Sequence, residues 1–318
     1  METHSLKSIV YITSRIQPMV RWFTDSLAYQ SSQAEKDNDL EIIFVDLLLD
    51  SPNADDRRKI FESAVDGRFK FKHVPPKPNV WQGKDRVTST DWFAASNARN
   101  TGLVHADGEH IAFVDDLSVL TGTWFLALKE AALSGKVTCG SYMKVKSLRV
   151  DNGNITHFEK YPGGEDNRYR YGNDSGPVPC GGNWLYGCSF TLPTQWLIDA
   201  NGSDEACDGM GFEDCILGIR LANRGHHFQY DRRLMSYEAE ELHHLDQIMR
   251  RTDKGVSPND KSHAILHLAN RTSRAENVHL GPDGIIGLRR VLRETGEIPL
   301  PDGPSHDWYD GQPICEMT

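Results

Sequence analysis

The sequence has few cysteines, no long apolar run and no excess of positive charge. Its six cysteines include no C-x-x-C pair, which argues against a disulfide scaffold and a zinc ribbon and favours ordinary buried thiols. No stretch reaches the ~18 apolar residues that a membrane-spanning helix needs. The formal net charge of −10 argues against a nucleic-acid backbone as the main partner, because such binding depends on clustered Lys and Arg.

The composition that is present is typical of a soluble globular protein. Of the 318 residues, 38% are hydrophobic and 25% are charged, which is enough for one large α/β domain or two small ones. The polar start, Met1 to Lys7, lacks the basic and apolar regions of a secretory signal. We therefore expect a cytoplasmic protein without a transmembrane segment.

Two apolar runs near the N-terminus predict parallel strands. Ser8 to Ile12 ends in the polar residues Thr13, Ser14 and Arg15, and Glu41 to Val45 ends in Asp46, with helical spacing between the two runs. A strand-helix-strand order favours a right-handed crossover, and ligands gather at the carboxyl ends of such strands. These four polar residues are thus candidates to contact a nucleotide base and ribose, although a role as loop caps explains each of them equally well.

Further elements follow from periodicity and turn residues. The patterns predict strands at 110–114, 137–150, 183–192 and 230–237, and helices at 89–104, 119–132, 213–221, 261–270 and 285–294, with loops at 73–86 and 161–182.

Two adjacent carboxylates follow the strand at 110–114. Asp115 and Asp116 would project from the carboxyl edge of the sheet, where their mutual repulsion is relieved if a divalent cation lies between them. The alternative is structural: one Asp caps the next helix and the other is exposed.

The surrounding segment favours the first interpretation. Residues 96–116 resemble the segment of family 2 and related GT-A glycosyltransferases in which an A-R-N-x-G helix leads through A-x-G-E to a strand and a D-x-D motif. The resemblance implies a mixed, mainly parallel α/β sheet flanked by helices, a nucleoside-diphosphate sugar as donor, and Mn²⁺ or Mg²⁺ as cofactor. Asp115 would then lie near the ribose or sugar. The third motif position is Leu117, so the second metal carboxylate must be Asp116 or come from elsewhere.

A second acidic pair opens the helix predicted at 213–221. Gly211-Phe212-Glu213-Asp214 resembles the G-x-E-D element of the same family, in which the Asp is the usual catalytic base. Inverting sugar transfer needs such a base to take the proton of the acceptor hydroxyl. The resemblance assigns this role to Asp214, and Glu213 would orient the acceptor or hold the loop. The structural alternative is that both acids only stabilise the helix N-terminus.

Other candidates are assigned more loosely. Asn183 and Trp184 resemble the acceptor side of the family, where Trp184 offers an aromatic face for a sugar, although a core Trp is equally plausible. A histidine after the last strand often completes the metal shell in the family, which points to His243 or His244; the alternative is a solvated helix histidine. The cations that could bind the diphosphate are Arg99, Arg251 and Lys254.

These features predict a catalytic domain over 1–245, with a nucleotide-sugar half at about 1–118 and an acceptor half at about 119–245. Residues 246–318 would form an extension with a lid loop and helices, used for the acceptor or for a homodimer contact. The base of the donor, UDP or GDP, and the acceptor, a glycan, glycolipid or small molecule, stay open. Two other functions are considered. A nucleotidyltransferase normally has a Gly-rich basic loop, which Thr13 to Pro18 lacks, and a non-catalytic carbohydrate-binding protein finds support in Leu117.

Overall fold

A computed structural model of the protein describes residues 6–33, 39–50, 53–79, 81–85, 91–208, 212–243 and 280–300. The strands are β1 (Lys7–Thr13), β2 (Leu40–Asp46), β3 (Lys70–Val74), β4 (His110–Asp115), β5 (Ser118–Leu120), β6 (Val137–Asp151), β7 (Asn154–Glu165), β8 (Val178–Cys180), β9 (Ser189–Pro193) and β10 (Phe228–Ala239). The helices are α1 (Val20–Gln33), α2 (Ala54–Val65), α3 (Ala95–His105), α4 (Trp124–Ser134), α5 (Thr194–Asp199), α6 (Glu213–Asn223), α7 (Glu240–His243) and α9 (Gly284–Thr295). Short 3-10 helices lie at Gly83–Asp85, Tyr169–Tyr171, Gly182–Trp184 and Glu205–Cys207.

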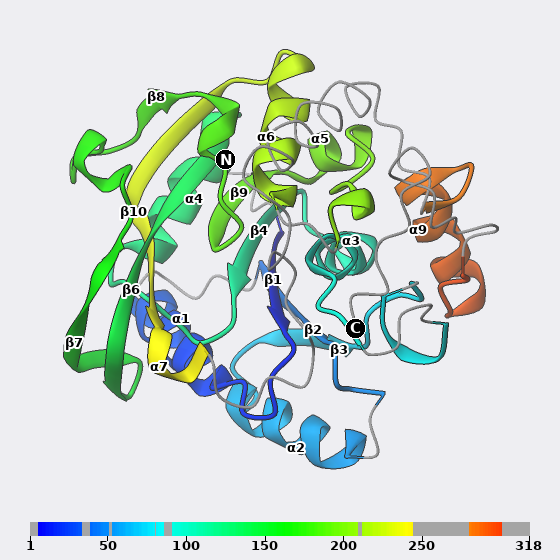
Figure 1. Cartoon of the computed structure of the whole chain (residues 1–318), viewed down its shortest axis with the longest axis horizontal. Coiled ribbons are helices and arrows are strands. Elements are labelled where there is room, and N and C mark those ends of the chain that lie inside the picture. Colours follow the sequence, from blue (N-terminus) through cyan, green and yellow to red (C-terminus); the bar gives the residue numbers. More distant parts are fainter. Residues whose placement is uncertain are drawn as a thin grey trace.

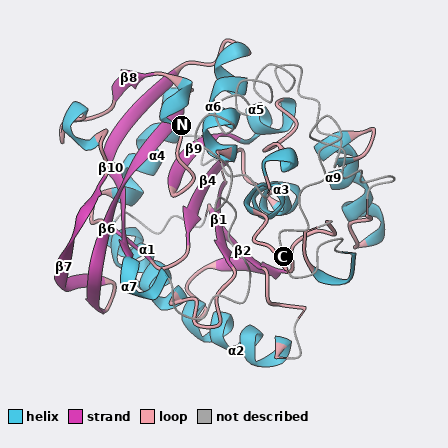
Figure 2. Cartoon of the chain, in the orientation of Figure 1, coloured by secondary structure: helices cyan, strands magenta, loops and turns pink. Residues whose placement is uncertain are grey.

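The strands form one mixed sheet in the order β3-β2-β1-β4-β9-β6-β10-β5, with β7 beside β6 and β8 beside β10. The first four strands are parallel, as are β6 and β10, whereas β9 runs antiparallel between β4 and β6. Figure 1 shows the curl of this sheet, and Figure 2 shows helices on both of its sides. The predicted mixed, mainly parallel α/β fold is confirmed.

Each face of the sheet has its own apolar core, because alternate residues of a strand point to opposite faces. Val10 of β1 belongs to the core that includes residues of α3, α5, α6 and α9. Its neighbour Tyr11 belongs to the core built with α1, α2 and α4. Ile285 and Leu288 join the first core, so α9 packs on the same sheet as the N-terminal strands.

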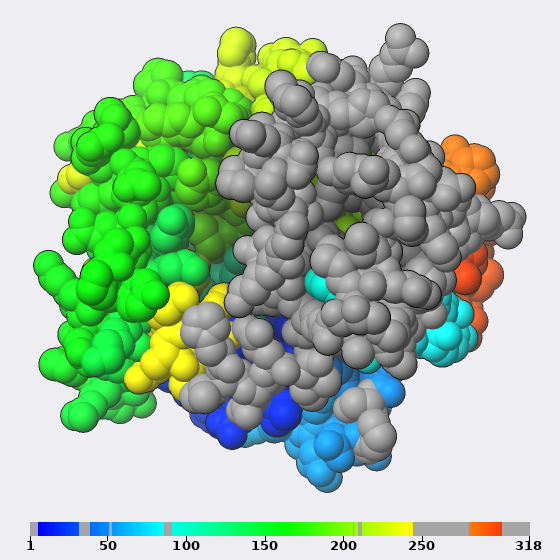
Figure 3. Space-filling model, in the orientation of Figure 1, coloured from blue at the N-terminus to red at the C-terminus, as the bar shows by residue number. Residues whose placement is uncertain are grey.

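The long hairpin β6-β7 extends one end of the sheet. It contributes to a smaller cluster in which Val145 and Leu148 of β6 pack with Val119 of β5 and Ala239 of β10. In the face drawn in Figure 3, this hairpin (green) and α9 (orange to red) lie at opposite sides of the molecule. Among the described residues, no helix combines the length and apolar character needed to cross a bilayer.

Several predicted boundaries were wrong. The helix expected at 119–132 starts at Trp124, because Ser118–Leu120 pairs with β10 and the Thr121 N–H bonds Met235 O at 3.0 Å. The strand expected at 183–192 starts at Ser189, and the helix expected at 89–104 starts at Ala95. The loop expected at 161–182 contains the end of β7 and all of β8. The helices expected at 213–221 and 285–294 are confirmed, whereas the one at 261–270 lies outside the described residues.

Candidate functional site

The two aspartates of the D-x-D-like motif stand where β4 ends. Leu117, the third motif position, is buried and has a left-handed backbone (φ 58°), which turns the chain from β4 into β5. Its side chain lies in the interior, so it takes no part in the acidic edge. Asp115 pairs with Ile12 in the sheet, which brings the loop after β1 beside the motif.

Two residues of the loop after β1 bind the side chain of Asp116. The Thr13 hydroxyl donates a hydrogen bond to Asp116 Oδ2 at 2.8 Å, and Arg15 Nε lies 2.9 Å from the same oxygen. Arg15 is itself buried, and its side chain also reaches α7. The sequence placed Thr13, Ser14 and Arg15 at this edge, and the structure brings Thr13 and Arg15 into contact with the motif.

Arg99 connects the motif to the second acidic pair. Its Nη1 lies 2.5 Å from Glu213 Oε1 and its Nη2 lies 3.4 Å from Asp115 Oδ1, with only 4% of the side chain exposed. Burial opposes the charge of Arg99, but the neighbouring acids Glu213, Asp115 and Asp214 outweigh it and raise the pKa of the guanidinium. One buried cation therefore joins the carboxyl end of β4 to the start of α6.

Gly187 fits against this cation. A Cβ at this position would lie 2.0 Å from Arg99 Nη2, so only glycine leaves room for the guanidinium. The Gly187 N–H also donates to Asp214 Oδ2 at 2.8 Å. Because one residue contacts both Arg99 and Asp214, it fixes their relative positions.

Asp214 sits in the first turn of α6, after a left-handed residue, Phe212 (φ 67°). Its Oδ1 accepts the Cys215 N–H at 2.7 Å. Burial and the neighbouring Glu213 raise the pKa of Asp214 to about 6, although Arg99 and the two backbone N–H groups act in the opposite direction. A carboxylate with this pKa is ionised at neutral pH and is a stronger base than an exposed one.

The N-terminus of α3 is capped by a residue more than a hundred positions away. Asp208 accepts the N–H of Ser96 at 2.7 Å and the N–H of Asn97 at 3.0 Å. A carboxylate at this end satisfies free donors and interacts favourably with the helix dipole. The cap ties the helix that carries Arg99 to the segment that leads into α6.

Asp116 and His243 converge on the same guanidinium. Arg15 Nη2 lies 3.1 Å from His243 Nδ1, while its Nη1 donates to His243 O at 2.9 Å. The described residues contain no three side chains already grouped as metal ligands. Carboxylate oxygens suit Mn²⁺ or Mg²⁺, whereas an imidazole nitrogen suits transition metals rather than Mg²⁺. Asp116 and His243 could therefore hold Mn²⁺ at the point that the Arg15 guanidinium occupies in this structure.

A further carboxylate lies beneath this edge. Glu238 of β10 pairs with Ser118 of β5 and is 8% exposed, and its Oε1 atom has no hydrogen-bond partner among the described residues. Burial, followed by the charges of Asp115 and Asp116, raises its pKa to about 8, while Lys144 opposes the shift. An orphaned buried oxygen beside two acids is a place where a cation would be stabilised.

Asp46 has a different environment. It is fully buried, and Arg57 binds both carboxylate oxygens at 2.6 and 2.7 Å. His73 Nε2 lies 3.0 Å away, and the Leu48 N–H donates to Oδ1. Its side chain therefore orders the loop after β2, at the same edge as Thr13.

The acceptor candidates lie beside α6. Asn183 is exposed and Trp184 is partly buried, with ring centroids 5.7 Å from Tyr171 and 5.4 Å from Tyr230. The short helix that holds them packs closely on α6, since a Cβ at Gly182 would lie 2.3 Å from Gly218 O. His244, Arg251 and Lys254 lie outside the described residues.

Sequence analysis missed Gly187, Asp208 and Glu238. Asp208 and Gly187 lie close in the sequence to the motifs identified above. However, the contacts Asp208–Ser96 and Gly187–Arg99 join segments about 90 to 110 residues apart. Glu238 extends a strand whose pattern predicts burial. An acid at a buried strand position is the sequence signal that could have identified it.

A curled mixed sheet with helices on both faces and acidic residues at the carboxyl end of β4 defines an α/β protein with the GT-A fold. The family model for glycosyl transferase family 2 matches residues 8–191, more than half of the chain. The chain therefore belongs to this family, as its motifs predicted.

Solved structures similar to the chain include TarS from S. aureus. The structure of TarS 1–349 has 13% sequence identity and a TM-score of 0.53, and the match covers 84% of this chain and 65% of that one. A structure of TarS 1–349 in complex with UDP has 14% identity and a TM-score of 0.49, with the same coverage. The chain thus spans 65% of the length of the TarS fragment. The comparison with curated protein sequences gives no match.

Proposed function

We propose that this protein transfers a sugar from a nucleoside-diphosphate sugar to an acceptor hydroxyl, with Asp214 as the base. Membership of glycosyl transferase family 2 supports sugar transfer over nucleotidyl transfer or simple carbohydrate binding. The observation that carries the proposal is the Arg99 bridge, because it holds Asp115 of the donor side and Glu213 of the acceptor side on one guanidinium. The bridge supports a site in which Asp115 of the donor side and the base Asp214, next to Glu213, act on the same sugar.

The donor would bind along the carboxyl ends of β1, β2 and β4. Thr13 and Ser14 are proposed to position the base and ribose at this edge, whereas Asp46, buried against Arg57, would contribute by ordering the loop after β2. Arg99, Arg251 and Lys254 would supply positive charge for the diphosphate, and Arg15 would do so once the divalent cation has displaced it from Asp116 and His243. Asp115, Asp116 and His243 or His244 would hold Mn²⁺ or Mg²⁺, which when bound neutralises charge on the departing diphosphate.

The acceptor would approach from the side of α6, over Asn183 and Trp184. Asp214 takes the proton of its hydroxyl as the oxygen attacks the anomeric carbon and the bond to the diphosphate breaks. Glu213 keeps Arg99 in place and thereby positions the base. Attack from the face opposite the leaving group inverts the configuration at the anomeric carbon.

The test is Asp214→Asn, assayed for transfer with a panel of UDP- and GDP-sugars. We expect turnover to fall at least ~100-fold with donor binding retained, as loss of a general base typically does. Asp174→Asn, an exposed aspartate paired with Arg232, is the matched control. Unchanged turnover in Asp214→Asn, or a product with retained anomeric configuration by NMR, would rule out the assigned base.

A further inference from the structure

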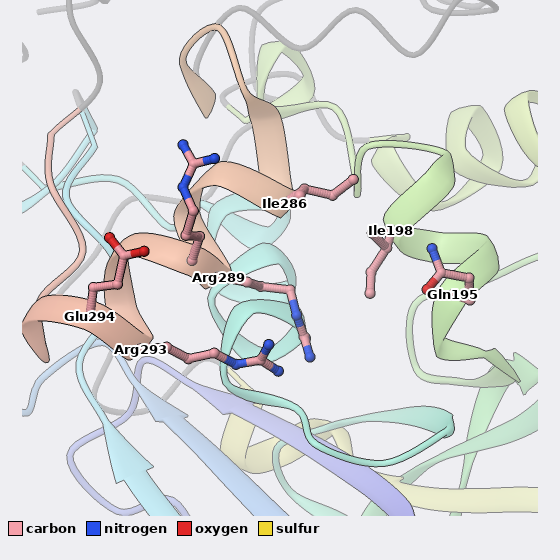
Figure 4. Close-up of a pocket in the computed structure, with 7 residues that line it drawn as sticks. Gln195, Ile198, Ile286, Arg289, Arg293 and Glu294 are labelled. Atoms are coloured by element: carbon pink, nitrogen blue, oxygen red, sulfur yellow. The ribbon is translucent and has the colours of Figure 1, made fainter.

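A groove far from the acidic edge gathers positive charge. It is an open groove between α5 and α9, with a volume of about 540 Å³. Figure 4 shows Arg289 and Arg293 extending from α9 toward the side where Gln195 and Ile198 of α5 lie. Its other lining residues are Ile286, Arg290 and Glu294. This volume is in the range of small-molecule sites.

Among the described residues, the two central arginines have no ion-pair partner, although Glu294 lines the same groove. Arg289 and Arg293 are four residues apart on α9 and thus share one helix face, where like charges repel. Among the described residues neither forms an ion pair, whereas Arg290 of the same helix binds Asp283 at 2.6 Å. Two neighbouring arginines without an ion-pair partner among the described residues thus lie in one groove of a chain whose net charge is −10.

Arg289 is held in position. Its Nη1 donates to Leu103 O at 2.5 Å, at the end of α3, so its guanidinium is fixed before any ligand arrives. Burial and the nearby Arg293 lower its pKa, which records the unfavourable charge at this site. Both arginines interact electrostatically with Asp107, but the Asp107 carboxylate already accepts a hydrogen bond from Lys72 at 2.6 Å. An external anion would relieve this repulsion.

The groove also offers apolar and amide surface. Ile286 is 60% exposed, and Ile198 lies across from it on α5. Together with the Gln195 amide, these side chains suit a ligand that has carbon–hydrogen faces and hydroxyl groups as well as a negative charge. A bare anion would use only the arginines.

We infer that the groove between α5 and α9 binds an acidic saccharide, a sugar unit that carries a phosphate, sulfate or carboxylate group. It is distinct from the proposed catalytic site. Arg289 bonds Leu103 O near the end of α3, before β4 begins, whereas Asp115 lies at the far end of β4, a strand roughly 17 Å long. Its purpose rests on the proposed function: a second site that retains an acidic glycan raises the effective concentration of the acceptor.

Calorimetry or ligand-observed NMR in EDTA, with glucose 6-phosphate as the probe, tests this site. We expect the protein to bind glucose 6-phosphate more tightly than glucose or inorganic phosphate. Arg293→Gln should weaken binding several-fold, and Arg289→Gln with Arg293→Gln at least ~10-fold, since charge-assisted hydrogen bonds are lost. The charge-matched control is Arg58→Gln with Arg224→Gln, which should bind like the parent.

Three results would overturn the inference. They are equal binding by the Arg289/Arg293 double variant, an equal loss in the control, or inorganic phosphate binding as tightly as the sugar phosphate. Among the described residues Arg293 forms no hydrogen bond or ion pair, so the single variant keeps the test valid if the double variant fails to fold. Asp115→Ala separates the two proposals: it should retain glucose 6-phosphate binding even if the proposed transfer reaction is wrong.

Discussion

At the scale of single residues, the acidic pair at the start of α6 divides two tasks. Glu213 is occupied by Arg99, whereas Asp214 is bound only by backbone N–H groups among the contacts described above. Backbone donors fix the carboxylate without neutralising it with a full charge. The environment therefore keeps Asp214 basic and oriented.

The pH dependence of transfer should report this environment. Since burial and Glu213 raise the pKa of Asp214 to about 6, the active, ionised form is lost as pH falls through that value. We expect kcat/KM to rise between about pH 5 and pH 7 and then level off. A pH–rate profile checks this, and Glu213→Gln should move the acidic limb to lower pH. A limb near pH 4 in the parent would contradict the assigned environment.

Arg15 is expected to compete with the divalent cation. Its guanidinium occupies the point on which Asp116 and His243 converge, so Arg15→Gln should tighten Mn²⁺ binding several-fold by calorimetry. Arg21→Gln, which removes an exposed arginine bonded to Ser63, is the control. Asp116→Ala should abolish the binding. If Arg15→Gln binds Mn²⁺ no better than the parent, the cation does not take that place.

At the scale of elements, the position of α3 depends on a cap from outside the helix. Its own preceding residue, Ala94, offers no side-chain bond, and Asp208 supplies both acceptors instead. Since α3 carries Arg99, the cap helps to set the geometry of the bridge. The contact between Asp208 and α3 therefore affects both the stability of the helix and the geometry of the site.

Asp208→Ala should therefore destabilise the protein by about 1–2 kcal/mol, with two buried donors left unsatisfied. Chemical denaturation measures this. The control is Asp55→Ala, because Asp55 is exposed. Asp204 is unsuitable as a control, because it binds the buried Arg220. The same Asp208 variant should lose transfer activity beyond its loss of stability. Full activity in a folded Asp208→Ala protein would separate the cap from the site.

The elements were predictable where periodicity was local. The strand-helix-strand start, the strand before Asp115 and the opening of α6 at Glu213 all followed from the sequence. The short strand β5 did not, because Ser118–Leu120 is extended by pairing with β10, more than a hundred residues away. The same reason hid Gly187 and Asp208. Their roles lie in close packing between distant segments, which a single sequence does not record.

At the scale of the whole molecule, a buried acid at the functional edge costs stability. Glu238 has a pKa of about 8, above the ordinary value of 4.5, and an unpartnered oxygen. The unfolded chain loses this proton at lower pH than the folded protein does. The contribution of Glu238 to stability is therefore fully present below about pH 4.5 and is lost as pH rises toward 8.

Glu238→Gln removes that dependence, because the amide does not titrate. In EDTA, we expect the difference in Tm between the variant and the parent to shift in favour of the variant by at least ~3 °C from pH 5 to pH 8. Glu241→Gln, on α7, is the control. A constant difference across this pH range would show that Glu238 is ionised in the folded protein. Saturating Mn²⁺ should restore stability to the parent at pH 8.

The sharing of Arg99 has a consequence for the order in which substrates act. While the donor is absent, Asp115 and the acids of α6 share the positive charge of Arg99. Once Asp115 engages an incoming donor, more of that charge would act on Glu213 and Asp214, which lowers the pKa of Asp214 and increases its ionised fraction near pH 6. Donor binding would therefore be accompanied by proton release, and the carboxylate would be ionised when the acceptor arrives.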